Sequence, residues 1–173
     1  MRSIGPRDEA LCEKDEVEAL GPGIYCSIMV LNSVMERAGN RILEEHKLTI
    51  PQWLALGAVL NCGDAGISHG QLGQRMMLSK APVTGLVDRL ARAGLVERRP
   101  DEHDRRVSRV VITPAGEELW HRANATLKDD SREDMLDSLD QDQQRQLLRL
   151  MSHLLSSFAA QDPHVAELVE NVG

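Results

Sequence analysis

Arginine and lysine side chains concentrate in one segment of the chain, residues 74–109. That segment holds nine basic residues and five acidic ones, a local charge of +4, while the whole 173-residue chain carries −7 and the remainder therefore −11. Guanidinium and ammonium groups at this density suit phosphate oxygens. A basic stripe on an acidic body is typical of a site-specific DNA-binding protein, although a solvated charged face is the commoner cause of such a run.

Neither the cysteines nor the histidines have the spacing of a metal site, a disulfide framework or a catalytic centre. Cys12, Cys26 and Cys62 are odd in number and far apart, and no C-x-x-C or H-x-x-x-H pair occurs. The sequence also lacks a glycine-rich phosphate loop and the G-x-S-x-G and H-E-x-x-H motifs. We therefore expect a protein that is not an enzyme and that needs neither a cofactor nor a metal.

Composition is that of a soluble globular protein with one core, with 42% hydrophobic and 27% charged residues. Aromatic residues make up only 2%, which disfavours readers of single-stranded nucleic acid, because these stack bases on aromatic rings. The longest clean apolar run, residues 53–60, is too short for a membrane span, and the acidic N-terminus has no signal-peptide core. We expect a cytoplasmic protein with no membrane partner.

The elements that must position the basic segment begin with a long helix. Residues 1–23 are polar and acidic and end in Gly21-Pro22-Gly23, which predicts a flexible arm or a short loose helix. From Ile24 to Ile42 apolar residues recur in alternating steps of four and three, which predicts a helix over residues 24–48. A second, partial apolar stripe leaves more apolar surface than one small domain covers, so we expect a second copy of the chain against it.

The next part of the chain contains several helix starts. T-x-x-Q at residues 49–52 and S-x-x-Q at residues 68–71 have the spacing of capping boxes. Ser79 can cap a further helix that ends at Gly94, a residue suited to the end of a helix. A short helix, a tight turn and a longer helix together predict a helix-turn-helix.

After Gly94 the pattern changes to two β-prone runs, residues 95–99 and 107–113. The polar loop between them makes a hairpin with a charged tip. Two further helices are predicted, one beginning at Thr113-Pro114 and the last at Asp140.

The predicted fold class is mainly α. A winged helix-turn-helix over residues 49–113 carries the hairpin wing, and residues 24–48 and 114–173 supply the helices of a dimerisation layer.

One segment, residues 78–119, reads LSKAPVTGLVDRLARAGLVERRPDEHDRRVSRVVITPAGEEL. It carries a D-x-x-D-R-R motif followed six residues later by I-T-P-x-G. Over residues 24–160 the chain resembles the MarR family of bacterial transcription regulators. The resemblance implies a regulator, most often a repressor, that binds a pseudo-palindromic double-stranded DNA operator as a homodimer. It also implies release from DNA by a small aromatic or phenolic ligand, or by an oxidant.

In such a fold the second helix of the helix-turn-helix presents its N-terminal side chains to base edges in the major groove. Lys80 can donate to guanine, and Val83 or the methyl group of Thr84 can pack against thymine methyl groups. Arg89 is a candidate phosphate contact. The predicted DNA-binding set of this helix is Ser79, Lys80, Pro82, Val83, Thr84 and Arg89.

The predicted wing carries cations toward a minor groove, which is narrow and electronegative. The family resemblance makes Arg106 the candidate for insertion, with Asp104 orienting an arginine and Asp88 as a second carboxylate anchor. Arg109 is a phosphate contact, part of the wing scaffold or a solvated charge, and the same alternatives hold for Arg89, Arg98 and Arg99. The predicted wing set is Asp104, Arg105, Arg106 and Arg109.

An effector pocket between the dimer layer and the DNA-binding domain could change the spacing of two recognition helices. The candidate lining residues are Met35, Arg41, His46, Trp53 and Trp120, although Met35 and Trp53 could equally be core residues. Two alternatives stay open: a regulator of the same fold that senses oxidants through a cysteine, and a winged helix that binds another protein. A steep loss of binding with salt would indicate DNA.

Overall fold

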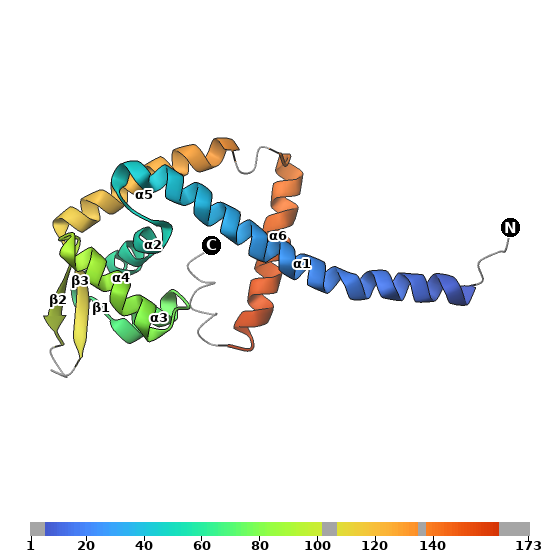
Figure 1. Cartoon of the computed structure of the whole chain (residues 1–173), viewed down its shortest axis with the longest axis horizontal. Helices are drawn as coiled ribbons and strands as arrows, with labels where there is room; N and C mark the ends of the chain where they lie inside the picture. Colours follow the sequence, from blue (N-terminus) through green and yellow to red (C-terminus); the bar gives the residue numbers. More distant parts are fainter. Residues whose placement is uncertain (1–5, 102–106, 135–137, 163–173) are drawn as a thin grey trace. The chain divides into compact units, whose positions relative to one another are not determined.

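The computed structural model describes residues 6–101, 107–134 and 138–162 (Figure 1), and their side chains apart from those of residues 6–19, Lys80 and residues 130–134. The described part is mainly helical with one small antiparallel sheet, which confirms the predicted fold class. Its elements are α1 (Pro6–Ile42), η1 (Leu43–His46), α2 (Ile50–Leu60), η2 (Gly63–Ala65), β1 (Ile67–Ser68), α3 (His69–Arg75), α4 (Lys80–Arg92), β2 (Val96–Pro100), β3 (Ser108–Ile112), α5 (Pro114–Asp134) and α6 (Gln141–Ala159). None of these described helices combines the length and the apolar character needed to cross a membrane.

The chain divides into two compact units, residues 1–41 and residues 42–173. The first unit is the helix α1, which begins at Pro6 and continues without a break through Gly21-Pro22-Gly23. The sequence predicted a flexible arm or a short loose helix over residues 1–23, and the structure has residues 6–23 within the long helix α1. The segment before Gly21 contains Glu, Ala, Leu and Lys residues, which favour a helix. The one internal proline, Pro22, costs the helix about 3 kcal/mol locally.

α1 exposes apolar side chains around much of its circumference. Four side chains of its predicted main stripe are 43–52% exposed in the single chain, and two of the partial second stripe are 51–54% exposed. The first group is Ile24, Ile28, Leu31 and Met35, and the second includes Met29 and Val34. This unit by itself therefore leaves a broad apolar surface in water.

The second unit is built around α2, which contacts α3, α4, α5 and β3. Fully buried leucine and valine side chains from these helices and strands form one core, to which the strand residues Ile67 and Val110 also belong. Trp53 on α2 and Trp120 on α5 are partly buried at its edge. The alternation of buried and exposed positions along α2 and α4 is that of helices packed on one side.

Capping boxes begin three of the helices, and the sequence predicted the first two of these boxes. At α2, Thr49 N–H donates to Gln52 Oε1 at 2.9 Å, and at α3, Ser68 N–H donates to Gln71 Oε1 at 3.1 Å. At α6 the carboxylate of Asp140 accepts hydrogen bonds from two backbone N–H groups of the first turn. These contacts satisfy N–H groups that have no partner inside the helix.

The sheet has the strand order β1-β3-β2 and is antiparallel throughout. Strands β2 and β3 form the predicted hairpin, with Val96 opposite Ile112 and Pro100 opposite Ser108. The two-residue strand β1 was not predicted, because two residues are too few for a β pattern to show. It places Ser68, the N-cap residue of α3, directly opposite Arg109 of β3.

The I-T-P-x-G motif forms the junction between the sheet and α5. Thr113 Oγ1 donates to the Gly94 carbonyl at 2.7 Å and accepts from Gly116 N–H at 3.1 Å. A Cβ atom added at Gly116 would lie 2.0 Å from the Leu95 carbonyl oxygen. The glycine is therefore required by a close approach of α5 to the backbone that precedes β2.

Helix α6 has an apolar side that is exposed in the single chain. Its large apolar side chains are between 37% and 62% exposed. They are Leu147, Leu148, Leu150, Met151, Leu154 and Phe158. α6 is therefore an amphipathic helix, and its apolar side is exposed as far as the described residues show.

Candidate nucleic-acid interface

Helices α3 and α4 are joined by a four-residue turn, residues 76–79, that fixes one helix against the other. Leu78 N–H donates to the Gly73 carbonyl at 2.8 Å, and Met77 has a left-handed backbone with φ of 51°. A Cβ atom at Gly73 would lie 2.9 Å from the Leu78 carbonyl oxygen, so a larger residue there would displace the turn. This geometry confirms the predicted helix-turn-helix.

Helix α4 has one face in the core and one face in solvent. Leu86, Val87 and Leu90 are buried, as expected. Val83 is also fully buried and packs toward Gly73, so its assignment to a base contact is wrong. The structure places Lys80 at the first position of α4 and describes only its backbone. The exposed side chains of the predicted set are Ser79, Pro82, Thr84 and Arg89.

Asp88 joins α4 to the hairpin. Its carboxylate accepts a hydrogen bond from the guanidinium of Arg98 on β2 and forms an ion pair with it. The Arg98 guanidinium holds the pKa of Asp88 below its ordinary value of 3.8, chiefly through this hydrogen bond. Asp88 is therefore a carboxylate anchor for the hairpin, as predicted, and the arginine that it holds among the described residues lies in the stem.

Replacing Asp88 with asparagine is expected to destabilise the protein in a pH-dependent way. Because the folded-state pKa of Asp88 is depressed, the ion pair contributes stability above the unfolded-state pKa, and this contribution is lost as the pH falls through the folded-state pKa. Urea unfolding of both proteins should therefore differ most at neutral pH, and the difference should shrink below about pH 4. A difference that stays constant down to pH 2.5 would show that the charge of Asp88 plays no part.

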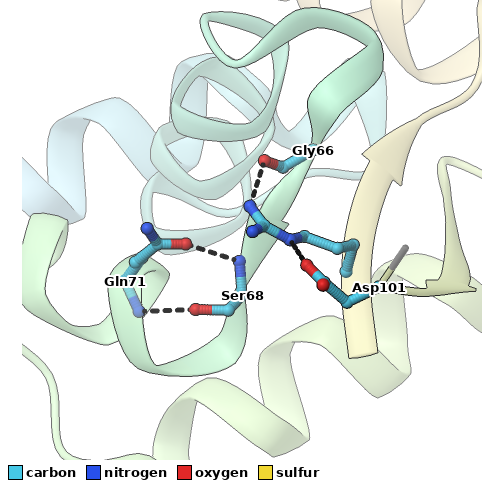
Figure 2. A network of polar contacts seen from close by, with 5 residues as sticks. Gly66, Ser68, Gln71 and Asp101 are labelled. Atoms are coloured by element: carbon cyan, nitrogen blue, oxygen red, sulfur yellow. Dashed lines mark hydrogen bonds and ion pairs between the residues drawn. The ribbon is translucent and has the colours of Figure 1, made fainter. Parts of the chain in front are cut away.

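The arginines of the hairpin stem are held by carboxylates. Arg99 donates through Nε to Glu97 at 2.7 Å, and Arg109 donates through Nε to Asp101 at 2.6 Å. The guanidinium of Arg109 also donates through Nη1 to the Gly66 carbonyl at 3.4 Å, and Figure 2 labels its two partners, Gly66 and Asp101. Of the alternatives that the sequence left open for Arg98, Arg99 and Arg109, these contacts favour scaffolding. Asp101 was not singled out from the sequence, because its partner follows eight residues later and only the strand register brings the two together.

The predicted wing tip residues Asp104, Arg105 and Arg106 lie outside the described residues. The stem closes beyond the last paired residues of β2 and β3, where Asp101 N–H donates to the Val107 carbonyl at 3.0 Å. Figure 1 shows this hairpin next to α4 in the same unit. The fold therefore brings the exposed side of α4 and the stem of the wing together.

The candidate effector residues do not form one described group. Trp53 and Trp120 stack, with ring centroids 6.4 Å apart and planes 6° from parallel, and His46 Nε2 lies 2.9 Å from Thr126 Oγ1. Met35 and Arg41 lie on α1, in the other unit. Both indole N–H groups are buried, and within the described part of the chain neither has a hydrogen-bond partner. Buried donors without partners are uncommon and call for an explanation.

The side chain of Cys62 makes two local contacts, because its thiol donates to the Ala58 carbonyl at 3.3 Å and its sulfur is contacted by Arg75. Cys26 is exposed on α1, and Cys62 is half-buried at the end of α2, where Arg75 Nη1 lies 3.1 Å from its sulfur. The side chain of Cys12 lies outside the description. Over the described residues, no group of three or more His, Cys, Asp or Glu side chains could hold a metal ion.

Comparison with known proteins shows which proteins are similar to the segment that contains this interface. Residues 46–107 match the model of the MarR family. The transcriptional activatory protein BadR of Rhodopseudomonas palustris is 38% identical over 89 residues, 51% of this chain and 51% of BadR. An uncharacterized HTH-type transcriptional regulator of Bacillus subtilis, YsmB, is 34% identical over 93 residues, 54% of this chain and 62% of YsmB. Over residues 46–107, this chain is therefore similar to the MarR family of transcriptional regulators.

Solved structures of MarR-family proteins share the fold. A mutant of MarR from E. coli complexed with operator DNA has a TM-score of 0.69 at 24% identity, over 82% of this chain and 96% of that one. CouR from Rhodococcus jostii bound to p-coumaroyl-CoA has a TM-score of 0.66 at 24% identity, over 79% of this chain and 91% of that one. At these identities the likeness concerns the fold alone. The chain spans 51% and 62% of the lengths of the two curated relatives above.

Proposed function

We propose that this chain is a MarR-family transcriptional regulator that binds a double-stranded operator through α4 and the hairpin of β2 and β3. The observation that carries the proposal is the exposed N-terminal side of α4 beside a hairpin stem held to it by Asp88 and Arg98. A helix displayed in this way fits the major groove, and a flanking hairpin reaches the neighbouring minor groove. Relatives described as transcriptional regulators support it.

In this proposal the first turns of α4 read base edges. Lys80 donates to guanine, and the methyl group of Thr84 packs against a thymine methyl group. Ser79 and Pro82 lie beside them on the exposed side, and Arg89 contacts phosphate. Gly85, where an added Cβ would meet only the end of the Arg89 side chain, keeps the helix thin enough to approach the bases.

The wing supplies the second contact. Arg106 enters the minor groove, Arg105 contacts phosphate beside it, and Asp104 orients an arginine by a charge-assisted hydrogen bond. Asp88 and Arg98 hold the stem against α4. The stem thereby lies at a set distance from the recognition helix.

The DNA-binding form is a homodimer. The exposed apolar sides of α1 and α6 provide surface that a second copy of the chain would cover. One α4 and one hairpin read few base pairs, and two copies related by a two-fold axis read a pseudo-palindrome. The half-sites are expected about 10 bp apart, one turn of the double helix.

Two substitutions test this function in a binding titration with operator DNA. Arg106→Ala should weaken binding to all sequences and lower the slope of affinity against salt by about one ion. Lys80→Ala should relax discrimination at one base pair by about 1–3 kcal/mol, because one base contact is lost. An Arg106→Ala protein with unchanged affinity and salt slope would remove the wing from the interface, and a protein with no preference for any DNA sequence would remove the function.

The proposed regulator is released by a small aromatic or phenolic effector. The stacked Trp53 and Trp120 and the two buried indole N–H groups are the support on this chain, because an oxygen acceptor on a ligand would satisfy such donors. Met35, Arg41 and His46 remain proposed lining residues. Calorimetry with a panel of aromatic carboxylates and phenols should show heat and a loss of DNA binding for at least one compound. No heat across the panel would exclude this class of effector.

Oxidant-dependent release is the second candidate mode of regulation. The contact between the Arg75 guanidinium and the Cys62 sulfur favours it over a purely apolar role for this cysteine. A protein in which Cys12, Cys26 and Cys62 are all serine should then stay on DNA after peroxide treatment that releases the parent protein. Release of the triple variant by peroxide would eliminate the cysteine mechanism.

A further inference from the structure

We infer that Arg109 and Asp101 form a positioning pair that fixes the direction of the wing, and that Arg109 does not contact DNA. The inference rests on the proposed function, in which the hairpin reaches DNA. It differs from the sequence-based expectation that Arg109 belongs to the DNA-contacting set. Four observations from the described residues carry it: the contacts of Arg109, its burial, the strand register and the second connection of the stem.

Arg109 connects two segments that are far apart in the sequence. Its Nε donates to Asp101 Oδ2 at 2.6 Å, and its Nη1 donates to the Gly66 carbonyl at 3.4 Å (Figure 2). The side chain of Asp101 is 10% exposed and that of Arg109 is 31% exposed. These two contacts use two of the five N–H donors of the guanidinium, and they hold it toward a nearly buried carboxylate and a backbone carbonyl.

The strand register places this contact where the wing meets the helix-turn-helix. Arg109 lies opposite Ser68 on one side and opposite Arg99 on the other. Ser68 is also the capping residue of α3, whose box with Gln71 appears beside Arg109 in Figure 2. A shift of the Arg109 backbone would therefore disturb the strand pairing that precedes the first helix of the motif.

The stem is connected on both of its faces. Because side chains alternate along a strand, Arg99 and Asp101 share a face with Arg109, and Arg98 lies on the opposite face. On that opposite face Arg98 binds Asp88 of α4. Arg99 and Arg109 are like charges directly opposite each other, and a carboxylate held by each one offsets their repulsion.

Asp101 and Arg109 lie near the end of the stem where the wing segment begins, so their contact can affect DNA binding. Asp101 is the last described residue before the wing segment 102–106, and its N–H closes the stem by donating to Val107 at 3.0 Å. The contact to Arg109 holds this end of the stem toward the loop of Gly66. Loss of the contact would widen the range of directions in which the stem delivers the arginines that follow.

Asp101→Asn separates positioning from direct phosphate contact. Removing a negative charge from a DNA-binding face should tighten binding if only electrostatics mattered. The positioning pair predicts the opposite, a loss of roughly tenfold in operator affinity, because a charge-assisted contact is lost. Arg109→Gln should lose a similar factor, and the double variant should be no weaker than either single one, because both break the same contact.

Two further variants serve as matched controls. Glu97→Gln removes the same charge from the same face of β2 and breaks the contact to Arg99 at the far end of the stem; because Asp101 still holds Arg109, it should bind operator at least as tightly as the parent protein. Arg109→Lys keeps the charge and one contact, so it should recover part of the lost affinity. Asp101→Asn protein that binds operator as tightly as the parent protein, or tighter, would overturn the inference.

Amide hydrogen exchange in the free protein tests the pair without DNA. In Asp101→Asn and Arg109→Gln the amides of the hairpin should exchange faster, while those of α2 and α4 stay protected. Uniformly faster exchange would show a general structural role and would overturn the positioning role. If the parent protein bound no DNA selectively, the proposed function would fail, and the exchange result would still decide whether the pair holds the hairpin.

Discussion

Replacing Gly116 with alanine is expected to leave little folded protein at 37 °C. The added Cβ atom would lie 2.0 Å from the Leu95 carbonyl oxygen and 3.1 Å from Ile112, and the first of these contacts is with backbone. Relief requires α5 to move away from the strand that follows Leu95, which also breaks the cap made by Thr113. We expect a loss of at least about 3 kcal/mol, a large part of the stability of a domain this size.

Thermal and urea unfolding of Gly116→Ala and Gly85→Ala make a matched comparison. Gly85 lies inside α4, and a Cβ atom there would meet only the Arg89 side chain, at 3.7 Å. Alanine at position 85 should therefore raise the free energy of unfolding by about 0.5–1 kcal/mol through helix propensity. A Gly116→Ala protein as stable as the parent protein would mean that α5 does not pack against Leu95 as described.

Replacing Leu31 with glutamate is expected to turn the proposed dimer into monomers and to abolish tight operator binding. Leu31 lies in the main apolar stripe of α1 and is 47% exposed in the single chain. A carboxylate placed in an apolar interface without a partner costs several kcal/mol. Because two linked half-site contacts become two independent ones, operator affinity should fall roughly 100-fold or more.

Sedimentation and operator titration should be run on Leu31→Glu beside Asn32→Glu. The control adds the same charge at the next position of α1 without removing an apolar side chain, so it should disturb the interface less. The folded state of both variants can be checked by circular dichroism, since the second unit has its own core. Leu31→Glu protein that stays dimeric and binds operator normally would exclude this face of α1 from the dimer.

The sequence predicts those parts of the fold that depend on residues close to one another in the chain. The capping boxes at residues 49–52 and 68–71 and the β-prone runs around the charged loop were read correctly, because each depends on neighbours within a few residues. The two-residue strand β1 carries no pattern of its own. The continuity of α1 through Gly21-Pro22-Gly23 was not predicted, because these three residues are typical of a turn although helix-forming residues precede them.

The sequence predicted which segments form the candidate site, but not which of their side chains contact one another. The sequence identified α4 and the wing, yet Val83 was assigned to the groove although it falls on the core face with Val87 and Leu90. Asp88 was assigned as an anchor, and its partner Arg98 was found only from the packing of β2 on α4. The pairing of Arg109 with Asp101 depends on strand register, which side-chain type alone does not determine.

The most direct test of the proposed regulator is footprinting of the purified protein on the promoter of its own gene, at low and physiological salt. We expect a protected pseudo-palindrome with half-sites about 10 bp apart, and a loss of affinity of at least about 100-fold between 50 and 200 mM salt. Protection that is absent at low salt, or that spreads over the fragment without sequence preference, would contradict operator binding by α4 and the wing.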